Sequence, residues 1–222
     1  HVGITESGEL DLADFKAKLS ERTRLVSLVH ISNALGCCNP LGEVIPLAHK
    51  VGALVLVDAC QSLAHQPIDT VALDADFLVG SSHKLCGPTG MGFLWGREAL
   101  LEAMPPFLGG GEMIQDVFLD SSSWAVLPHK FEAGTPAIGE AVGMGAAIRY
   151  LQTIGLDAIQ AWEAQLTRYL FERLQAIDGV KILGPTPEQQ PERGALATFL
   201  VDGVHANDIA ELIDASGICI RS

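Results

Sequence analysis

The sequence has few aromatic residues, no long apolar run and no excess of positive charge. Only 3 Trp, 2 Tyr and 8 Phe occur among 222 residues, so we expect a core built mainly of Leu, Ile, Val and Ala. No run of about 18 apolar residues is present, so no membrane span is predicted. Lys and Arg number 14 against 27 Asp and Glu, whereas a duplex-binding protein needs a positive surface that displaces counterions from phosphates. Neither nucleic acid nor a membrane is therefore an expected partner.

The sequence also lacks a Cys-x-x-Cys pair or any zinc-ligand spacing, so no metal site is predicted. Its cysteines are odd in number (5) and irregular in spacing, which argues against a disulfide framework and favours free thiols in a reducing compartment. We therefore expect a cytoplasmic location, or the stroma of an organelle if the source is eukaryotic. The chain begins at His1 and stops at Ser222, directly after an apparent strand, which indicates a fragment that lacks both ends.

Apolar strands and helices alternate along the chain, a pattern typical of an α/β protein with a mostly parallel sheet. The run 53–57 is short and wholly apolar, as expected for a strand buried on both faces. Asp11 is placed to cap the first helix, and Pro40 suits the start of the second. The predicted strands are 24–31, 53–57, 77–79 and 91–95, and the predicted helices are 11–19, 40–50, 136–151 and 157–177.

A change of domain is predicted near residue 150. Residues 1–150 would form part of a large domain, in which 109–135 is irregular, and long irregular segments are usually functional or form interfaces. Residues 151–222 would form part of a smaller α+β domain that opens with the amphipathic helix 157–177. Its apolar residues at three- and four-residue steps are Ile159, Trp162, Leu166, Leu170, Leu174 and Ile177. After it we expect strands at 180–183, 195–201 and 217–221 and a helix at 207–215.

Two polar side chains follow two apolar strands. Asp58 comes directly after the run ALVLV, and Lys84 follows the strand 77–79, just before a Gly-Pro turn. Ligands of open α/β sheets bind outside the carboxyl ends of the strands, and a carboxylate there is costly to desolvate unless a cation meets it. Taken singly, each residue has a structural explanation: Asp58 would cap the following helix, and Lys84 would pair with a carboxylate on a loop.

When Asp58 and Lys84 are considered together, one binding site accounts for the positions of both. Their spacing is about that of one strand-to-strand crossover, so both would face one crevice at the ends of nearby parallel strands. An acid for a pyridinium nitrogen and an amine for an aldehyde are the two contacts that a pyridoxal phosphate (PLP) enzyme needs. Ser81 and His83 add hydroxyl and imidazole donors suited to a phosphate. We expect the carboxylate and the amine to face each other across about one pyridine ring.

Longer stretches around these residues carry a resemblance to a known family. They are HISNALGCCNPLGEV, VDACQSLAHQPIDTVALDADFLVGSSHKLCGPTGMGFLWG, GGGEMI and KFEAGTPA. The chain resembles the fold-type I PLP enzymes of the class V aminotransferase-related family over all 222 residues. Within that family it is most similar to the group II cysteine desulfurases of the Suf system, with selenocysteine lyases nearby. The resemblance implies a PLP-dependent transferase fold and the conversion of L-cysteine to L-alanine, with persulfide sulfur passed to an acceptor protein for iron–sulfur cluster assembly.

The resemblance also implies a role for each motif residue. Lys84 would be the catalytic lysine that binds the PLP aldehyde, and Asp58 would pair with the pyridine nitrogen. Further cofactor contacts are implied for Gln61 and Asn33 at the ring hydroxyl, Ser81 and His83 at the phosphate, and Thr135 at the phosphate of a neighbouring subunit. The last contact implies a homodimer. Asn33 would also meet the substrate carboxylate, and Arg221 matches an active-site arginine of the family.

Two departures from the family pattern imply that the fragment itself is inactive. The family's first segment, with a Gly-Thr-Thr phosphate cradle at a helix start and a His that stacks on PLP, has no counterpart here. The chain also ends before the Gly-His-His-Cys loop that carries the nucleophilic cysteine. None of the cysteines present is expected to replace it. The alternatives are a selenocysteine lyase or another class V enzyme, and a non-catalytic remnant of the fold that only dimerises or binds a partner.

The remaining polar residues receive structural interpretations. Cys60 is expected to point away from Asp58 and Gln61 into packing. His30 is interpreted as a satisfied core histidine rather than a site residue. The acidic cluster Asp69, Asp74 and Asp76 predicts a solvated loop with a helix cap rather than a metal site.

Overall fold

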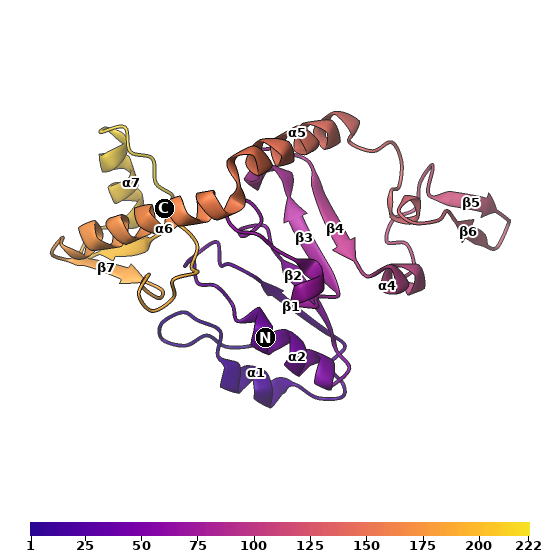
Figure 1. Cartoon of the computed structure of the whole chain (residues 1–222), viewed down its shortest axis with the longest axis horizontal. Helices are drawn as coiled ribbons and strands as arrows, with labels where there is room; N and C mark the ends of the chain where they lie inside the picture. The colour runs from indigo at the N-terminus through magenta and orange to yellow at the C-terminus, as the bar shows by residue number, and fades with distance from the viewer.

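The computed structural model describes residues 1–222 and has a four-stranded sheet at its centre (Figure 1). The strands lie in chain order: β1 (Leu25–Val29), β2 (Leu54–Asp58), β3 (Phe77–Ser81) and β4 (Gly92–Gly96). The first three are parallel, and β4 pairs antiparallel with β3. The mostly parallel sheet predicted from the alternation of strands and helices is therefore confirmed.

The helices that flank this sheet begin where the sequence predicts. The Asp11 carboxylate accepts the N–H groups of Ala13 and Asp14 and so caps α1 (Leu12–Lys18). Pro40 precedes α2 (Leu41–Lys50). Short elements follow in the loops between strands: α3 (Thr70–Leu73), the 3-10 turn η1 (Ser82–Lys84) and α4 (Glu98–Ala103).

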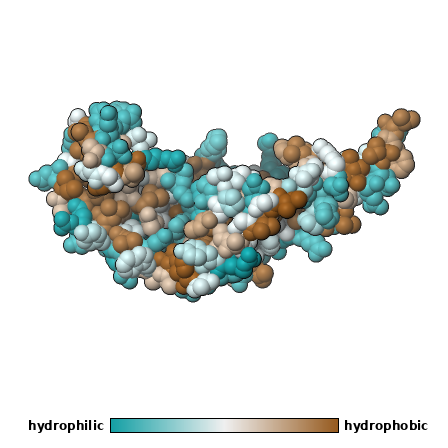
Figure 2. All heavy atoms as spheres, turned by 90° about the horizontal axis from the view of Figure 1, so that it is seen from above, coloured by the Kyte–Doolittle hydropathy of each residue, from teal (hydrophilic) through white to brown (hydrophobic).

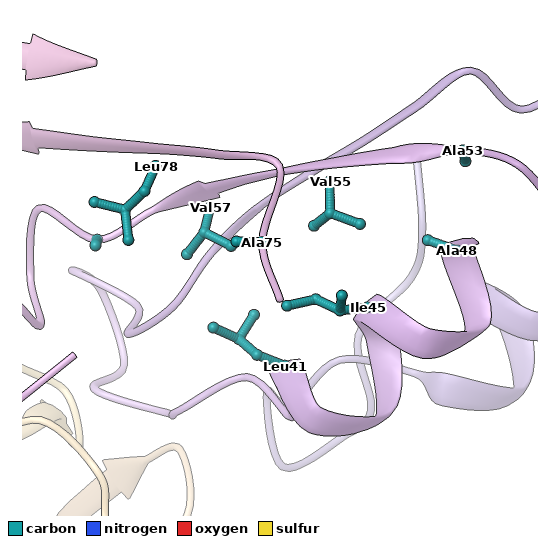
Figure 3. Close-up of a cluster of buried hydrophobic side chains, with 9 residues drawn as sticks. Leu41, Ile45, Ala48, Ala53, Val55, Val57, Ala75 and Leu78 are labelled. Atoms are coloured by element: carbon teal, nitrogen blue, oxygen red, sulfur yellow. The ribbon is translucent and has the colours of Figure 1, made fainter. Parts of the chain in front are cut away.

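The core lies between α2 and the sheet (Figure 3). Ile45 and Ala48 of α2 pack toward Val55 and Val57, which are wholly buried on one face of β2. The other face of β2 is only half-buried, so the expectation of a strand covered on both faces is wrong. This packing fixes the position of β2 and therefore of Asp58 at its end.

A long arm leaves the sheet after α4 and returns at α5 (Ile138–Ile154), at the right of Figure 1. The sequence predicts this stretch to be irregular, but it contains a hairpin of β5 (Ile114–Val117) and β6 (Ser122–Trp124), followed by the 3-10 turn η2 (His129–Phe131). Most of its large apolar side chains lie in solvent, with Phe118 64% and Leu119 108% exposed, whereas Met113 is wholly buried. Figure 2 shows hydrophobic residues gathered at that end of the molecule. The arm therefore leaves an apolar surface uncovered in the single chain.

The side chain of a buried lysine, Lys130, joins the end of the arm to helix α4. Its Nζ donates to the carbonyls of Leu101 (3.1 Å) and Glu102 (2.9 Å), which belong to the last turn of α4. The end of a helix leaves carbonyls without partners, and a cation satisfies them and their partial negative charge. The position of the arm is therefore set by an ion–helix contact that hydrophobic patterning does not reveal.

The last third of the chain turns at Gly155 (φ 89°) between α5 and α6 (Leu156–Gln175). The antiparallel strands β7 (Val180–Leu183) and β8 (Thr198–Val201) follow, and then α7 (Ala206–Asp214). The strand predicted at 217–221 is wrong, because these residues pair with neither strand. The division into two domains near residue 150 stays a prediction.

The burial of α6 also differs from the sequence pattern. Trp162, Leu166 and Leu170 are 60%, 48% and 40% exposed, whereas Thr167 and Phe171 are buried. The predicted apolar stripe thus faces mostly outward in this chain, and a neighbouring stripe contacts the rest of the molecule. None of the helices combines the length and apolar character that crossing a membrane requires.

Candidate functional site

Asp58 ends β2 at the carboxyl edge of the sheet. Its neighbours across the sheet are Val29 on β1 and Val79 on β3. The side chain is half-buried, and its Oδ1 accepts the N–H of Cys60 at 2.9 Å. No helix follows Asp58, only a series of turns. The carboxylate therefore stabilises a turn, and the alternative in which it caps a helix does not hold.

Lys84 lies at the end of the neighbouring strand, as expected. Ser81 is the last residue of β3, and η1 carries Lys84 one turn beyond it. Lys84 is half-buried, whereas His83 is exposed. Because β2 and β3 are parallel neighbours, Ser81 and Lys84 come to the same edge of the sheet as Asp58.

Groups from both strand ends affect the pKa of the Cys60 thiol. Burial raises the pKa of Cys60, the Asp58 carboxylate raises it further, and Lys84 and the Ser81 hydroxyl lower it. A carboxylate, an ammonium and a hydroxyl therefore all act on one side chain. The hydrogen bond that joins Cys60 to Asp58 comes from the Cys60 backbone N–H, and the expected direction of the Cys60 side chain stays a prediction.

The turn beneath Lys84 is packed so closely that only glycine fits at residue 87. A Cβ at Gly87 would lie 2.3 Å from the Oγ of Ser82 and 3.0 Å from its carbonyl oxygen. Ser82 is wholly buried, and its Oγ has no hydrogen-bond partner. Gly87 also donates its N–H to the Ser82 carbonyl at 3.0 Å. The turn that presents Lys84 is therefore fixed by backbone contact.

Gly87→Ala is expected to destabilise the protein by about 1–3 kcal/mol, because overpacking displaces either the turn or Ser82. The measurement is the urea midpoint of unfolding. In a Ser82→Ala background the Oγ is absent, so the same substitution is expected to cost less. Equal costs in the two backgrounds would show that the clash is not with Ser82. Gly90→Ala cannot serve as the control because Gly90 has φ +75°, but Gly139, with open space around it, allows Gly139→Ala.

His30 has its hydrogen bonds satisfied next to the edge of the sheet. Its Nδ1 lies 3.0 Å from the Ser62 Oγ, and the Gln66 amide lies 3.4 Å from its Nε2. Burial lowers the pKa of His30, so the ring is neutral at pH 7. These contacts support the interpretation of a core histidine.

Asn33 and Arg221, the two predicted substrate contacts, line one cavity of about 610 Å³, which lies in the size range of small-ligand sites. Both side chains are exposed. Thr198 and Phe199 of β8 and Cys219 complete the wall beside them.

The other predicted residues lie in different settings. Gln61 is half-buried directly after Cys60, and Thr135 is exposed on the arm shortly before α5. Near Asn33, burial raises the pKa of the Cys38 thiol to about 11 and also raises that of Cys37. Such thiols are protonated at neutral pH and therefore weak nucleophiles.

The acidic cluster is only partly as predicted. Asp69 caps α3 through the N–H groups of Val71 and Ala72, as expected. Asp76, however, is 5% exposed, so the expectation of a solvated loop is wrong for this residue. Its carboxylate accepts the N–H of Val55 and lies next to the imidazole of His49.

Comparison with protein families decides the relationship. The profile described as aminotransferase class-V matches residues 1–222. The chain belongs to this family. The family resemblance predicted from the motifs around Asp58 and Lys84 is therefore confirmed.

The chain is similar to several named proteins and solved structures, two of which are named cysteine desulfurase. A protein of Synechocystis sp. named probable cysteine desulfurase is 54% identical over 221 residues, which are 100% of this chain and 52% of that protein. The apo structure of a cysteine desulfurase from Thermococcus onnurineus NA1 superimposes with a TM-score of 0.92 at 38% identity, over 100% of this chain and 55% of that one. A C-DES variant with glycine covalently linked to the PLP cofactor superimposes with a TM-score of 0.84 at 26% identity, over 96% and 56%. The chain thus spans about half the length of its relatives and has the fold of PLP enzymes.

Proposed function

We propose that this chain provides PLP-binding residues and part of the substrate site of a cysteine desulfurase. The observation that carries the proposal is that Asp58 at the end of β2, Ser81 at the end of the parallel neighbour β3 and Lys84 in η1 come to one edge of the sheet. The relatives named cysteine desulfurase support it. Because the chain spans about half their length, we assign the activity to the complete gene product rather than to these residues alone.

The residues at the sheet edge fit PLP by their chemistry. The Asp58 carboxylate suits a protonated pyridine nitrogen, and the Lys84 amine suits an aldehyde. The hydroxyl of Ser81 and the exposed imidazole of His83 would bind the phosphate, with Thr135 supplied by a neighbouring subunit. Gln61 and Asn33 would contact the ring hydroxyl.

Each group has a defined task in such a site. PLP, when bound, provides a ring that withdraws electrons from the substrate Cα, and this makes cleavage of the C–S bond possible. Asp58 would keep the proton on the ring nitrogen, because a carboxylate beside a cationic nitrogen stabilises the charged form. Lys84 would hold the cofactor covalently and then carry a proton at Cα. Asn33 and Arg221, at the cavity of about 610 Å³, would orient the L-cysteine carboxylate.

The finer assignments belong to the same proposal. We infer the group II, Suf-type subgroup, with transfer of sulfur to an acceptor protein. The exposed apolar arm, with Phe118 and Leu119 in solvent, supports a homodimer in which a second copy covers it. All five cysteines are free, which supports the cytoplasm as the compartment.

The test is to trap the cofactor on its lysine. The protein is mixed with PLP, reduced with borohydride and digested, and the modified peptide is identified by mass spectrometry. The expected result is a single stable pyridoxyl adduct on Lys84, accompanied before reduction by a visible absorbance band. Asp58→Asn is expected to weaken PLP binding but to leave the adduct on the same lysine.

Other results would contradict the proposal. Adducts spread over exposed lysines such as Lys16, Lys50 and Lys181 would indicate nonspecific reaction with surface amines. The Lys84→Ala variant serves as the control, because it should show the background level alone. Absence of the band in the complete gene product would favour a non-catalytic remnant of the fold.

A further inference from the structure

The segment 190–198, which precedes and enters β8, holds the loop 32–38 that carries Asn33. The amide of Gln190 pairs with both backbone groups of Cys38. Its Oε1 accepts the Cys38 N–H at 2.6 Å, and its Nε2 donates to the Cys38 carbonyl at 2.8 Å. The Gln190 side chain therefore makes the pair of backbone hydrogen bonds that a neighbouring strand would otherwise make with this end of the loop.

Two glycines let the backbones of these segments touch. The Gly194 N–H donates to the Gly36 carbonyl at 2.7 Å. Gly36 has φ +71°, and a Cβ on it would lie 2.8 Å from the Arg193 Nη2 and 3.0 Å from the Gly194 carbonyl oxygen. A Cβ on Gly194 would lie 2.7 Å from the Ile31 side chain. The two segments can therefore approach this closely only because glycine occupies positions 36 and 194.

Arg193 and Thr198 complete the contact. The Arg193 Nη2 donates to the Leu35 carbonyl at 2.5 Å, and the guanidinium stacks 4.3 Å from the ring of Phe171 on α6. Arg193 is only 8% exposed. The Thr198 hydroxyl donates to the Ala34 carbonyl. Each carbonyl from Ala34 to Gly36 is thus held by the segment 190–198.

These contacts surround Asn33 without touching its side chain. The Ser32 hydroxyl accepts the N–H groups of Ala34 and Leu35, both at 3.2 Å, and so shapes the turn around Asn33. Asn33 and Thr198 line the same cavity, which also contains Arg221. The conformation of the Asn33 turn is therefore set from residues more than 150 positions away in the chain.

We propose that Gln190, Arg193 and Thr198 are positioning residues that fix the Asn33 turn for substrate binding. The inference rests on the proposed role of Asn33 in binding the substrate carboxylate. Displacement of a substrate-orienting group weakens substrate binding more than it affects cofactor binding. The segment 190–198 thereby couples the part of the chain after α6 to the edge of the central sheet.

The test uses Gln190→Leu, which keeps the size of the side chain and removes both hydrogen bonds to Cys38. In the holoenzyme of the complete gene product, we expect the KM for L-cysteine to rise roughly three- to tenfold with kcat unchanged. The PLP absorbance band should keep its intensity and shift only slightly, because Asn33 would also contact the ring hydroxyl. Hydrogen exchange of the amides in 32–38 should become faster. Gln190→Glu keeps the acceptor for the Cys38 N–H and should show an intermediate KM, as should Thr198→Val. The matched control is Gln175→Leu at the exposed end of α6.

The outcomes separate the two proposals. An unchanged KM with unchanged exchange in 32–38 would overturn the positioning role. A rise in KM accompanied by equal losses of kcat and of PLP binding would also overturn the positioning role, because these changes together would indicate a general loss of structure. If the unmodified protein forms no alanine from L-cysteine, the proposed function fails, and this is seen before any variant is made.

Discussion

Replacement of Lys84 by alanine is expected to lower the rate of alanine formation from L-cysteine by about 10³-fold or more in the complete gene product. A positioned proton carrier alone contributes about 10²–10⁴-fold to a rate, and Lys84→Ala also removes the covalent link to the cofactor. The lysine is half-buried at the end of η1, where it acts on the same thiol as Asp58.

The experiment distinguishes a chemical role of Lys84 from a structural one. Alanine formation is measured at saturating L-cysteine with PLP in excess, and Lys50→Ala, at the exposed end of α2, is the matched control. Addition of a small primary amine should restore part of the activity of Lys84→Ala but not change the control, because the amine replaces the missing proton carrier. A rate within about tenfold of the unmodified protein, a loss of only 1.4 kcal/mol in barrier terms, would remove Lys84 from the proposed site.

Local sequence signals predicted the elements that position this lysine. The cap at Asp11, the helix start after Pro40 and the apolar strands depend on neighbouring residues, and each lies within a few positions of its prediction. Asp58 and Lys84 were predicted to share an edge because parallel strands bring their carboxyl ends together. That inference requires only that the two strands are parallel and lie next to each other in the sheet.

Features that depend on distant contacts were not predicted. The conformation of the loop 32–38 depends on hydrogen bonds from Gln190 and Arg193, which lie more than 150 positions further along the chain. Periodicity alone gave the helix α6 but not which face is buried, because this is decided by what lies beside it. Thr167 and Phe171 are buried there although the more apolar stripe is not.

Asp76 is the clearest case of a charge whose surroundings the sequence conceals. Its Oδ2 accepts the Val55 N–H at 2.7 Å and lies 2.9 Å from the His49 Nε2. Its Oδ1 lies 3.1 Å from the Nε of Arg97. Asp74 contacts Arg97 and lies 3.4 Å from the His49 Nδ1. The network joins α2, the start of β2 and the end of β4, at the edge of the sheet opposite Asp58.

Asp76→Asn is therefore expected to destabilise the protein by about 3 kcal/mol, a typical loss when one partner of a buried ion pair is removed. The amide has nearly the shape of the carboxylate, but its NH₂ group faces donors on at least one side. A donor such as the Val55 N–H or the Arg97 guanidinium then lacks its acceptor, and an unsatisfied buried group is costly. The measurement is the urea midpoint of unfolding, with the slope of the transition unchanged.

Asp74→Asn provides the matched comparison, because it makes the same chemical change two residues earlier at an exposed side chain (62%). The Arg97 guanidinium beside Asp74 holds the pKa of that carboxyl below its usual range, but solvent screens such exposed pairs and makes them weak. Only a small shift in the midpoint is expected for this variant. Equal shifts of the midpoint for the two variants would show that the burial of Asp76 does not determine how much its carboxylate stabilises the protein. A large shift of the midpoint for Asp76→Asn, with unchanged PLP absorbance, would show that the network stabilises the sheet without affecting cofactor binding at the opposite edge.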